Sequence, residues 1–498
     1  MRDASRSSGV LCPLFSLPMG DGMGDLGSAA FHFIDRLHEA GFLYWALLPF
    51  SPLAHPYCPY SAISSMGIEP LYISIEQLRM AKLLTTKGGF TGPHHEIDYD
   101  QVVAFKKPLL HQAVSNFLND AHHDWRDDYA HFIQSEPWVT DFALFVALKN
   151  HFAGLPFWQW PQPYRDRATD TLHGFAQEHQ QMLEEQKVLQ YFAHRQWREV
   201  KAYAYSKGIS TFGDLPLYVA ADSLDVWRYP EDFQLNADKT VSHVAGVPPD
   251  AFSDTGQKWG NPLYDWPRIQ QANFSFWKKR LAYQHQQFDL LRIDHFLGLH
   301  RYWSIPADND TATHGAYKPG PGQAFFNEMK NHFGPLSWVL EDLGAVTPGS
   351  AALQKATELP GMAVLQFGWN NPHQNPHHPT HHHVHSVCYL GTHDNETWQQ
   401  WWDGQSDDIQ NQVTQYVGNA SIDVREKGLY LSLGSPSKLS IIPLPDLLRC
   451  DATGRINVPG VIEGNWKWRC TQEQLDQLDV VHLASLNQLF NRMPPQTP

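Results

Sequence analysis

The stretch FDLLRIDHF, residues 288–296, decides how this sequence folds. A short run of mostly apolar residues ends at Asp294, which predicts a buried strand over 290–293. A carboxylate directly after a parallel strand is typical of (β/α)8 barrels, whose active sites lie at the carboxyl ends of the strands. The stretch therefore favours a barrel with Asp294 at its mouth.

Seven similar runs, each ending in a polar or Gly-rich turn, alternate with longer helical patterns elsewhere in the chain. Eight parallel strands with intervening helices make a (β/α)8 (TIM) barrel, so we expect one elaborated α/β barrel over 1–498. The eight predicted strands cover 10–15, 44–49, 209–215, 290–293, 338–340, 363–367, 387–390 and 439–442.

Two intervals are longer than the connections of a bare barrel. Residues 55–205 contain amphipathic stretches and predict a mostly helical insertion subdomain. Residues 220–266 are rich in Pro, Asp and Trp and predict a long loop region that covers the cleft at the carboxyl-terminal face.

Composition limits the class of protein. The chain has 498 residues, of which 42% are hydrophobic, enough for a sizeable core. A net charge of -15 argues against nucleic acid and against an anionic membrane surface as partners. The five Cys form no CxxC pair, and no stretch is apolar and long enough to cross a bilayer. These features favour a cytoplasmic protein.

Eighteen Trp and a His-rich segment each allow two interpretations. The Trp side chains either pack in the core or stack on sugar rings. The His-rich stretch at 370–385 suggests a metal site, but its three Pro and lack of regular His spacing favour a mobile loop that binds metal incidentally. We expect no functional metal.

Three acidic residues, Asp294, Glu341 and Asp394, each follow a predicted strand. A retaining glycosidase uses one carboxylate as nucleophile and another as acid/base. Arg292, two residues before Asp294 on the same strand face, would keep that carboxylate ionised, and His393 with Asp394 would grip sugar hydroxyls. Taken singly, an Asp after a strand is commonly a helix cap and a Glu-Asp pair a solvated turn.

Segments along nearly the whole chain resemble the amylomaltase (disproportionating enzyme) family of 4-α-glucanotransferases, with the same order and spacing. They are GDLG at 24–27, PYS at 59–61, PLYISIE at 70–76, GDLPLYV at 213–219, PPDAFS at 248–253, TGQKWGNPLYDW at 255–266, LRIDHF at 291–296, EDLG at 341–344, GTHDN at 391–395, NVPG at 457–460 and GNWKWR at 464–469.

This resemblance implies Asp294 as nucleophile, Glu341 as acid/base and Asp394 as transition-state stabiliser. It also implies a barrel without a separate C-terminal β-sandwich and a reaction without cofactor. The implied sugar contacts are Tyr60, Asp214, Asp250, Gln257, Trp259, Arg292, His295, His393 and Asn457.

Some positions depart from the family pattern. Leu297 and Ala363 replace usual basic residues, and Cys58, Glu69 and Pro445 replace usual polar ones. The carboxylates are intact, so we expect these changes to alter efficiency and chain-length preference more than the type of reaction.

The resulting hypothesis is transfer of α-1,4-glucan segments between maltooligosaccharides or starch- and glycogen-derived glucans, through a covalent glucosyl-enzyme. The alternatives are an α-1,4-glucan hydrolase with the same carboxylates, a weakly active glucan-binding homologue, and a metal-dependent hydrolase that uses the His-rich stretch.

Overall fold

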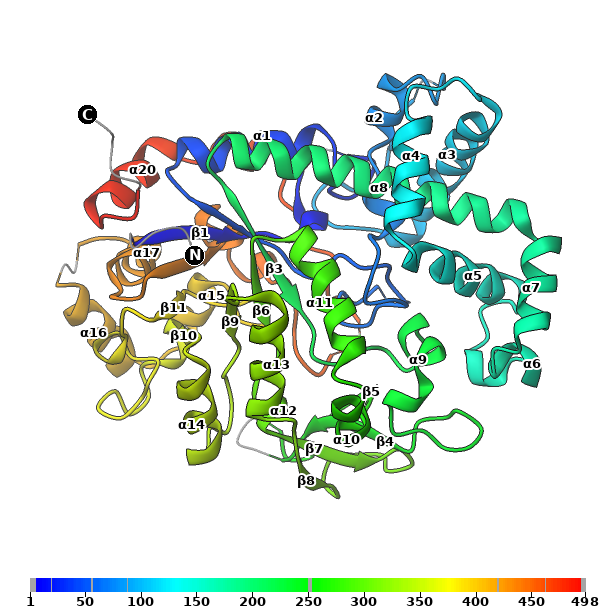
Figure 1. Cartoon of the computed structure of the whole chain (residues 1–498). Helices are drawn as coiled ribbons and strands as arrows, with labels where there is room; N and C mark the ends of the chain where they lie inside the picture. Colours follow the sequence, from blue (N-terminus) through cyan, green and yellow to red (C-terminus); the bar gives the residue numbers. More distant parts are fainter. Residues whose placement is uncertain are drawn as a thin grey trace.

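Eight parallel strands form a ring at the centre of the protein (Figure 1), in the order β10-β11-β12-β1-β2-β3-β6-β9. The amide of Leu340 at the end of β9 donates to the carbonyl of Pro360 before β10 over 2.8 Å, which closes the ring. The computed structural model describes residues 6–18, 20–54, 57–86, 88–249, 253–418, 421–461 and 463–493. The strands are β1 (Ser7–Leu11), β2 (Tyr44–Ala46), β3 (Ser210–Leu215), β6 (Leu290–Ile293), β9 (Trp338–Leu340), β10 (Gly361–Val364), β11 (Ser386–Tyr389) and β12 (Leu439–Pro443).

The predicted (β/α)8 barrel is confirmed, and each predicted strand overlaps an observed one. Three strands, β1, β10 and β11, begin earlier in the sequence than predicted. Strand β1 ends at Leu11 because Pro13, which has no N–H to donate, leads into a 3-10 turn at Leu14–Ser16. Strand β10 begins at Gly361, which pairs with Ser386 of β11.

The barrel strands are buried along their whole length because helices cover the outside and side chains fill the inside. The layer between strands and helices is tightly packed: a Cβ at Gly213 of β3 would lie 2.3 Å from the ring of Phe288, which itself packs against Trp197, so no larger residue fits there. The helices that follow or flank the barrel strands are α1 (Ser28–Glu39), α8 (Gln180–Ser206), α11 (Ser275–Gln287), α13 (Gln323–Phe333), α14 (Pro348–Thr357), α15 (Trp398–Asp403), α16 (Asp407–Val417), α17 (Val424–Gly434), α18 (Leu444–Leu447), α19 (Gln472–Asp476) and α20 (Val480–Leu489).

A group of helices lies to one side of the barrel, joined to it by the long helix α8 (Figure 1). These helices fall between β2 and β3 in the chain, in the interval where the sequence predicts a helical insertion. Side chains cap the first two of them: Ser74 accepts from the amide of Gln77 at the start of α2, and Asp98 from the amide of Gln101 at the start of α3. The helices are α2 (Ile75–Met80), α3 (Tyr99–Asn119), α4 (Arg126–Ser135), α5 (Trp138–His151), α6 (Gln162–Arg165) and α7 (Thr169–Glu178).

A second, antiparallel sheet of order β5-β4-β7-β8 lies at one end of the barrel (Figure 1). The interval 220–266, predicted as a long loop, contains two of its strands and the helix α9, and α10 begins at its last residue. Strand β4 pairs with β7, which lies far along the chain, and local sequence does not reveal such pairing. The elements are α9 (Leu224–Arg228), β4 (His243–Val247), β5 (Gln257–Pro262), α10 (Trp266–Gln271), α12 (Leu297–His300), β7 (Arg301–Pro306) and β8 (Ala316–Pro319).

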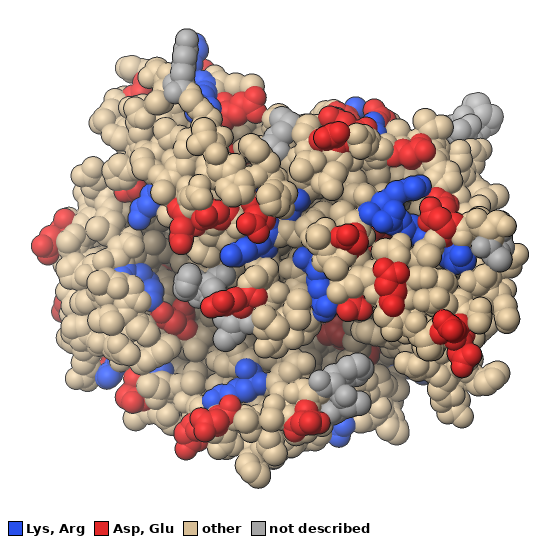
Figure 2. Space-filling model, turned by 180° about the vertical axis from the view of Figure 1, so that it is seen from behind, with Lys and Arg blue, Asp and Glu red and all other residues tan. Residues whose placement is uncertain are grey.

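The division into a barrel over 1–498, an insertion at 55–205 and a cleft-covering region at 220–266 stays a prediction, because secondary structure alone defines no domain boundary. Of the helices described, none combines the length and the apolar character needed to cross a membrane. On the face in Figure 2, acidic and basic side chains are interspersed, and the described residues form no continuous basic area there.

Candidate active site

The carboxyl ends of three neighbouring strands bring Asp214, Arg292, Asp294 and Glu341 to one mouth of the barrel. Asp214 of β3 lies opposite Arg292 of β6 in the strand register. Asp294 follows β6 directly, and Glu341 follows β9, the next strand in the ring. The predicted convergence of strand ends is therefore present for these residues.

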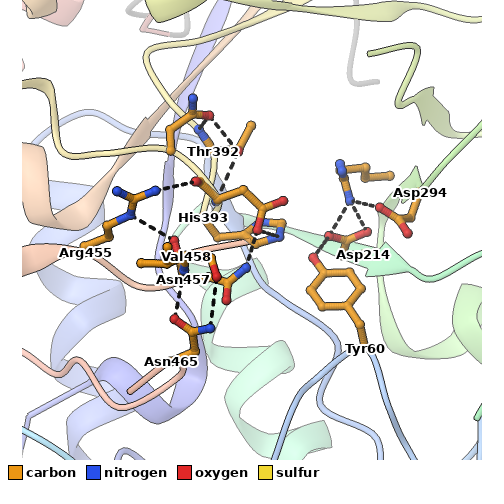
Figure 3. A network of polar contacts seen from close by, with 12 residues as sticks. Tyr60, Asp214, Asp294, Thr392, His393, Arg455, Asn457, Val458 and Asn465 are labelled. Atoms are coloured by element: carbon orange, nitrogen blue, oxygen red, sulfur yellow. Dashed lines mark hydrogen bonds and ion pairs between the residues drawn. The ribbon is translucent and has the colours of Figure 1, made fainter. Parts of the chain in front are cut away.

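The guanidinium of Arg292 holds two carboxylates at once. Its Nη1 donates to both oxygens of Asp214 at 2.8 Å and to Oδ1 of Asp294 at 2.9 Å. The hydroxyl of Tyr60, from the loop after β2, donates to Oδ2 of Asp214 at 2.7 Å. Figure 3 shows Tyr60 and Asp294 on opposite sides of Asp214. A buried, fully ionised Arg in this position orients Asp294 and favours its charged form.

Burial and charge set different pKa values for the two central carboxyls. Removal from water raises the pKa of Asp294, and the charge of Arg292 opposes this rise. Removal from water also raises the pKa of Glu341, and the nearby charge of Asp294 adds to the rise while Arg292 opposes it. The Glu341 pKa is the higher of the two. As the pH rises, Asp294 therefore loses its proton first, and Glu341 stays protonated up to a higher pH.

The turn after Asp294 holds the Glu341 carboxylate. The amides of His295 and Leu343 donate to its two oxygens over 2.6 and 2.9 Å. His295 has a φ of 49°, in the left-handed region that non-Gly residues rarely adopt. Such conformations persist where the surroundings enforce them, and they concentrate at active sites.

A second cluster lies across the barrel mouth at the end of β11 (Figure 3). The Asp394 carboxylate accepts from Nδ2 of Asn457 over 2.6 Å, and Nε2 of His393 lies 3.4 Å away. The ring of His393 stacks on Tyr60, with centroids 5.2 Å apart and an interplanar angle of 19°. This stacking joins the Asp394 cluster to the Arg292 network. Burial lowers the pKa of His393, which favours the neutral ring.

The remaining predicted site residues lie on β5 and beside it. Nε1 of Trp259 donates to Oε1 of Gln257 over 3.0 Å. The Trp259 ring meets the ring of His295 edge-on, with centroids 4.9 Å apart, and 38% of its surface is exposed. This position next to the turn of Asp294 leaves a face of the indole accessible. Asp250 lies outside the described residues.

Several further residues contact the site that the sequence did not single out, although Trp466 and Tyr218 lie within the segments 464–469 and 213–219. Trp466 packs on both Tyr60 and His393, with ring centroids 5.9 Å from each. Arg455 contacts the loop of Asp394, and its place two residues before the NVPG segment is the one hint in the sequence. Tyr218, which follows β3, packs against Trp259.

Hydrogen bonds connect the His-rich stretch 370–385 to neighbouring segments, whereas the sequence predicts a mobile loop there. Nδ1 of His382 bonds to the Ser435 hydroxyl at 2.8 Å, and Nε2 of His385 bonds to the Glu358 carbonyl at 2.9 Å. Burial lowers the pKa of His382 to about 4. In the described part of the chain no group of three His, Cys, Asp or Glu side chains is arranged to hold a metal ion.

The departures from the family pattern have local structural roles. Glu69 accepts from the amides of Leu53 and Leu71 and so caps the turn at Pro70–Tyr72. Leu297 begins α12 and lies next to Gly344, whose added Cβ would be 3.7 Å from it. Ala363 is buried in β10. None of these positions interrupts the hydrogen bonds among the carboxylates.

Comparison with protein families matches residues 12–475 to the family model described as 4-alpha-glucanotransferase. A 4-alpha-glucanotransferase of Synechocystis sp. is 38% identical over 98% of this chain and 98% of its own length. One from Thermus thermophilus is 36% identical over 98% of this chain and 99% of its own.

Among solved structures, the amylomaltase of Streptococcus agalactiae in complex with acarbose has a TM-score of 0.95 and 33% identity. The match covers 98% of this chain and 100% of that one. The amylomaltase of Corynebacterium glutamicum shares the fold, with a TM-score of 0.75 and 17% identity over 98% of this chain and 76% of its own. The sequence and the fold agree along the length of the protein, and the chain belongs to the 4-alpha-glucanotransferase family.

Proposed function

We propose that this protein is a retaining 4-α-glucanotransferase in which Asp294 is the nucleophile, Glu341 the acid/base and Asp394 the transition-state stabiliser. The observation that carries the proposal is the pairing of Asp294 with Arg292 over 2.9 Å beside Glu341, the carboxyl with the higher pKa. This arrangement supplies an ionised nucleophile and a protonated acid at the same pH.

In the first half-reaction, Asp294 attacks the anomeric carbon of a donor glucan while Glu341 protonates the departing glycosidic oxygen. A β-linked glucosyl-enzyme forms. In the second, Glu341 removes the proton from the 4-hydroxyl of an acceptor sugar, which displaces Asp294 and restores an α-1,4 bond. Two inversions give net retention. The bond formed has the energy of the bond broken, so the reaction needs no cofactor.

Asp394 and the residues around it bind the sugar at the reacting centre. Hydrogen bonds to ring hydroxyls strengthen as the sugar distorts toward the transition state. Asp394 is held by Asn457 and His393, and 44% of its side chain is exposed, so its free oxygen is accessible to a sugar hydroxyl. Tyr60, Asp214 and Gln257 would contact neighbouring hydroxyls.

Transfer in place of hydrolysis requires an acceptor that outcompetes water. Trp259, exposed beside His295, offers an apolar face on which a glucose ring can stack. A bound acceptor chain displaces water from the glucosyl-enzyme and presents its 4-hydroxyl at high effective concentration.

We assign maltooligosaccharides and starch- or glycogen-derived α-glucans as donors and acceptors. The binding groups described above are carboxylates, amides and aromatic rings, which suit a neutral polyol. We also assign the reaction to the cytoplasm, where thiols stay reduced, because all five cysteines are free.

The test is incubation with pure maltotriose in the presence of a metal chelator, with products resolved by size and an Asp294→Asn control. Two maltotriose molecules should give glucose and maltopentaose, with longer chains later, and the control should give neither. Glucose and maltose alone would indicate a hydrolase. Retained glucan binding without any product would indicate a binding homologue, and loss of activity to the chelator would indicate a metal-dependent reaction.

A further inference from the structure

Arg455 lies in the loop after β12 and faces the loop that carries Asp394 (Figure 3). We propose that Arg455 is a positioning residue for glucan transfer: it clamps the 391–397 loop to Asn457 and so fixes the Asp394 carboxylate. The inference rests on the function proposed above for Asp394, and it assigns to Arg455 no contact with substrate.

The Asp394 carboxylate depends on polar neighbours for its orientation. Its side chain is 44% exposed, so packing alone does not select one rotamer. Oδ1 accepts from Nδ2 of Asn457 over 2.6 Å, the shortest of its side-chain contacts, while Nε2 of His393 lies at 3.4 Å. A shift of Asn457 would therefore turn the carboxylate away from the sugar.

Asn457 lies in a segment that forms neither helix nor strand. Hydrogen bonds from side chains, and not a regular pattern of backbone hydrogen bonds, hold this segment in place. Nε of Arg455 donates to the Asn457 carbonyl over 3.1 Å. On the other side, the amide of Val458 donates to Oδ1 of Asn465 over 2.8 Å, and Nδ2 of Asn465 donates to the Val461 carbonyl over 2.7 Å. Asn457 is thus held between Arg455 and Asn465.

The other two nitrogens of Arg455 reach the Asp394 loop. Nη2 donates to the Asp394 carbonyl over 3.4 Å, and Nη1 donates to Oε1 of Glu396 over 3.5 Å. The Glu396 carbonyl in turn accepts from Nε2 of Gln366 over 2.8 Å, which ties this loop to the end of β10. One guanidinium therefore joins the two loops whose side chains meet at Asp394 and Asn457.

The geometry requires Arg and not just a cation. Three donors on one rigid plane reach a carbonyl of each loop and a carboxylate, an arrangement that a Lys ammonium on a flexible stem does not reproduce. The side chain is 23% exposed, so the contacts are partly shielded from water. Loss of the clamp should misplace Asp394 by a fraction of an ångström to an ångström, and misplacements of that size cost on the order of 100-fold in rate.

The experiment compares Arg455→Ala, Arg455→Lys, Asn457→Ala and the Arg455→Ala/Asn457→Ala pair with the full-length enzyme, using maltotriose. We expect Arg455→Ala to lower kcat about 10- to 100-fold with a smaller change in KM and an unchanged melting temperature. The kcat of Arg455→Lys should lie between those of Arg455→Ala and the wild type. Added guanidinium should partly restore the kcat of Arg455→Ala. The kcat loss in the double variant should be smaller than the product of the two single losses, because Arg455 and Asn457 hold the same carboxylate.

A matched control is Arg198→Ala, which removes an exposed Arg on α8 that pairs with Asp128 over 2.7 Å. Its kcat should equal that of the wild type. The inference would be overturned if the two single losses in kcat multiplied in the double variant. It would also be overturned if a lower melting temperature accounted for the lost activity.

A second measurement is independent of turnover. Backbone amides at 391–397 should exchange hydrogen faster in Arg455→Ala than in the wild type, and unchanged exchange would overturn the inference. An inactive wild type would instead count against the proposed function, while the exchange data would still decide the role of Arg455.

Discussion

The amide of His295 donates a hydrogen bond to Oε2 of Glu341 across 2.6 Å, although the two residues follow different strands of the barrel. This amide belongs to the residue after Asp294, so one short contact couples the position of the proposed nucleophile to that of the proposed acid/base. The bond lowers the Glu341 pKa against the larger effect of burial, which raises it.

We expect Glu341→Gln to lower kcat/KM for maltotriose by about 10²- to 10⁴-fold, because Gln cannot protonate the leaving oxygen. The loss should be smaller for α-glucosyl fluoride with a glucan acceptor, since fluoride leaves without full protonation. Initial rates with both donors test this expectation. Asp294→Asn should lose activity on both donors. Equal losses on the two donors in Glu341→Gln would argue against an acid role.

The pH dependence of kcat/KM follows from the two raised pKa values. Activity should rise as the pH passes the Asp294 pKa, because the nucleophile must lose its proton, and fall as it passes the Glu341 pKa, because the acid must keep its own. Burial raises both values, so the optimum should lie above the range near pH 4 where free carboxyls titrate. Initial rates across a pH series measure this, and an optimum near pH 4 would contradict it.

We expect Trp259→Ala to raise the KM for maltooligosaccharides about 10-fold and to increase the share of hydrolysis, because the exposed indole face would no longer stack on a sugar. Trp259→Phe should raise the KM less than Trp259→Ala, because the Phe ring retains part of the stacking. The melting temperature should stay unchanged in both variants. A lower melting temperature with unaltered KM would instead show that the indole serves packing against His295.

Lys106 and Asp25 form a buried ion pair outside the site, with 0% and 4% of their side chains exposed and 3.5 Å between Nζ and Oδ2. Lys106→Met should lower the free energy of unfolding by about 3–5 kcal/mol, because Asp25 would be left buried without its cation. The Leu71 carbonyl, which accepts from Lys106 over 2.6 Å, would also lose its donor.

Urea denaturation measures this change, with Lys106→Met/Asp25→Asn as the matched variant. Burial raises the Asp25 pKa and Lys106 lowers it, so the loss in Lys106→Met should grow as pH rises and Asp25 ionises. The double variant should recover much of the stability. An equal loss in both variants, independent of pH, would show that packing and not charge holds this region.

The barrel strands could be predicted because each is a short apolar run with a polar end, which is a local pattern. The strands β4 and β5 within 220–266 could not, because β4 pairs with β7, which lies far along the chain, and β5, the strand beside β4, is largely exposed and has no apolar run. The same contrast applies to the site, where Asp294 and Glu341 come directly after strands, whereas Arg455 lies well beyond the end of β12.

The sequence by itself located the strands that precede Asp294, Glu341 and Asp394, and with them the positions of these carboxylates at one face of the barrel. This is so because parallel strands that alternate with helices share a common carboxyl-terminal edge. Only the tertiary structure decided how the loops meet there: which amides hold Glu341, and that Asn457 and Arg455 hold Asp394. Those contacts join residues far apart in the chain through side-chain hydrogen bonds, whose geometry depends on the packed backbone and on no local pattern.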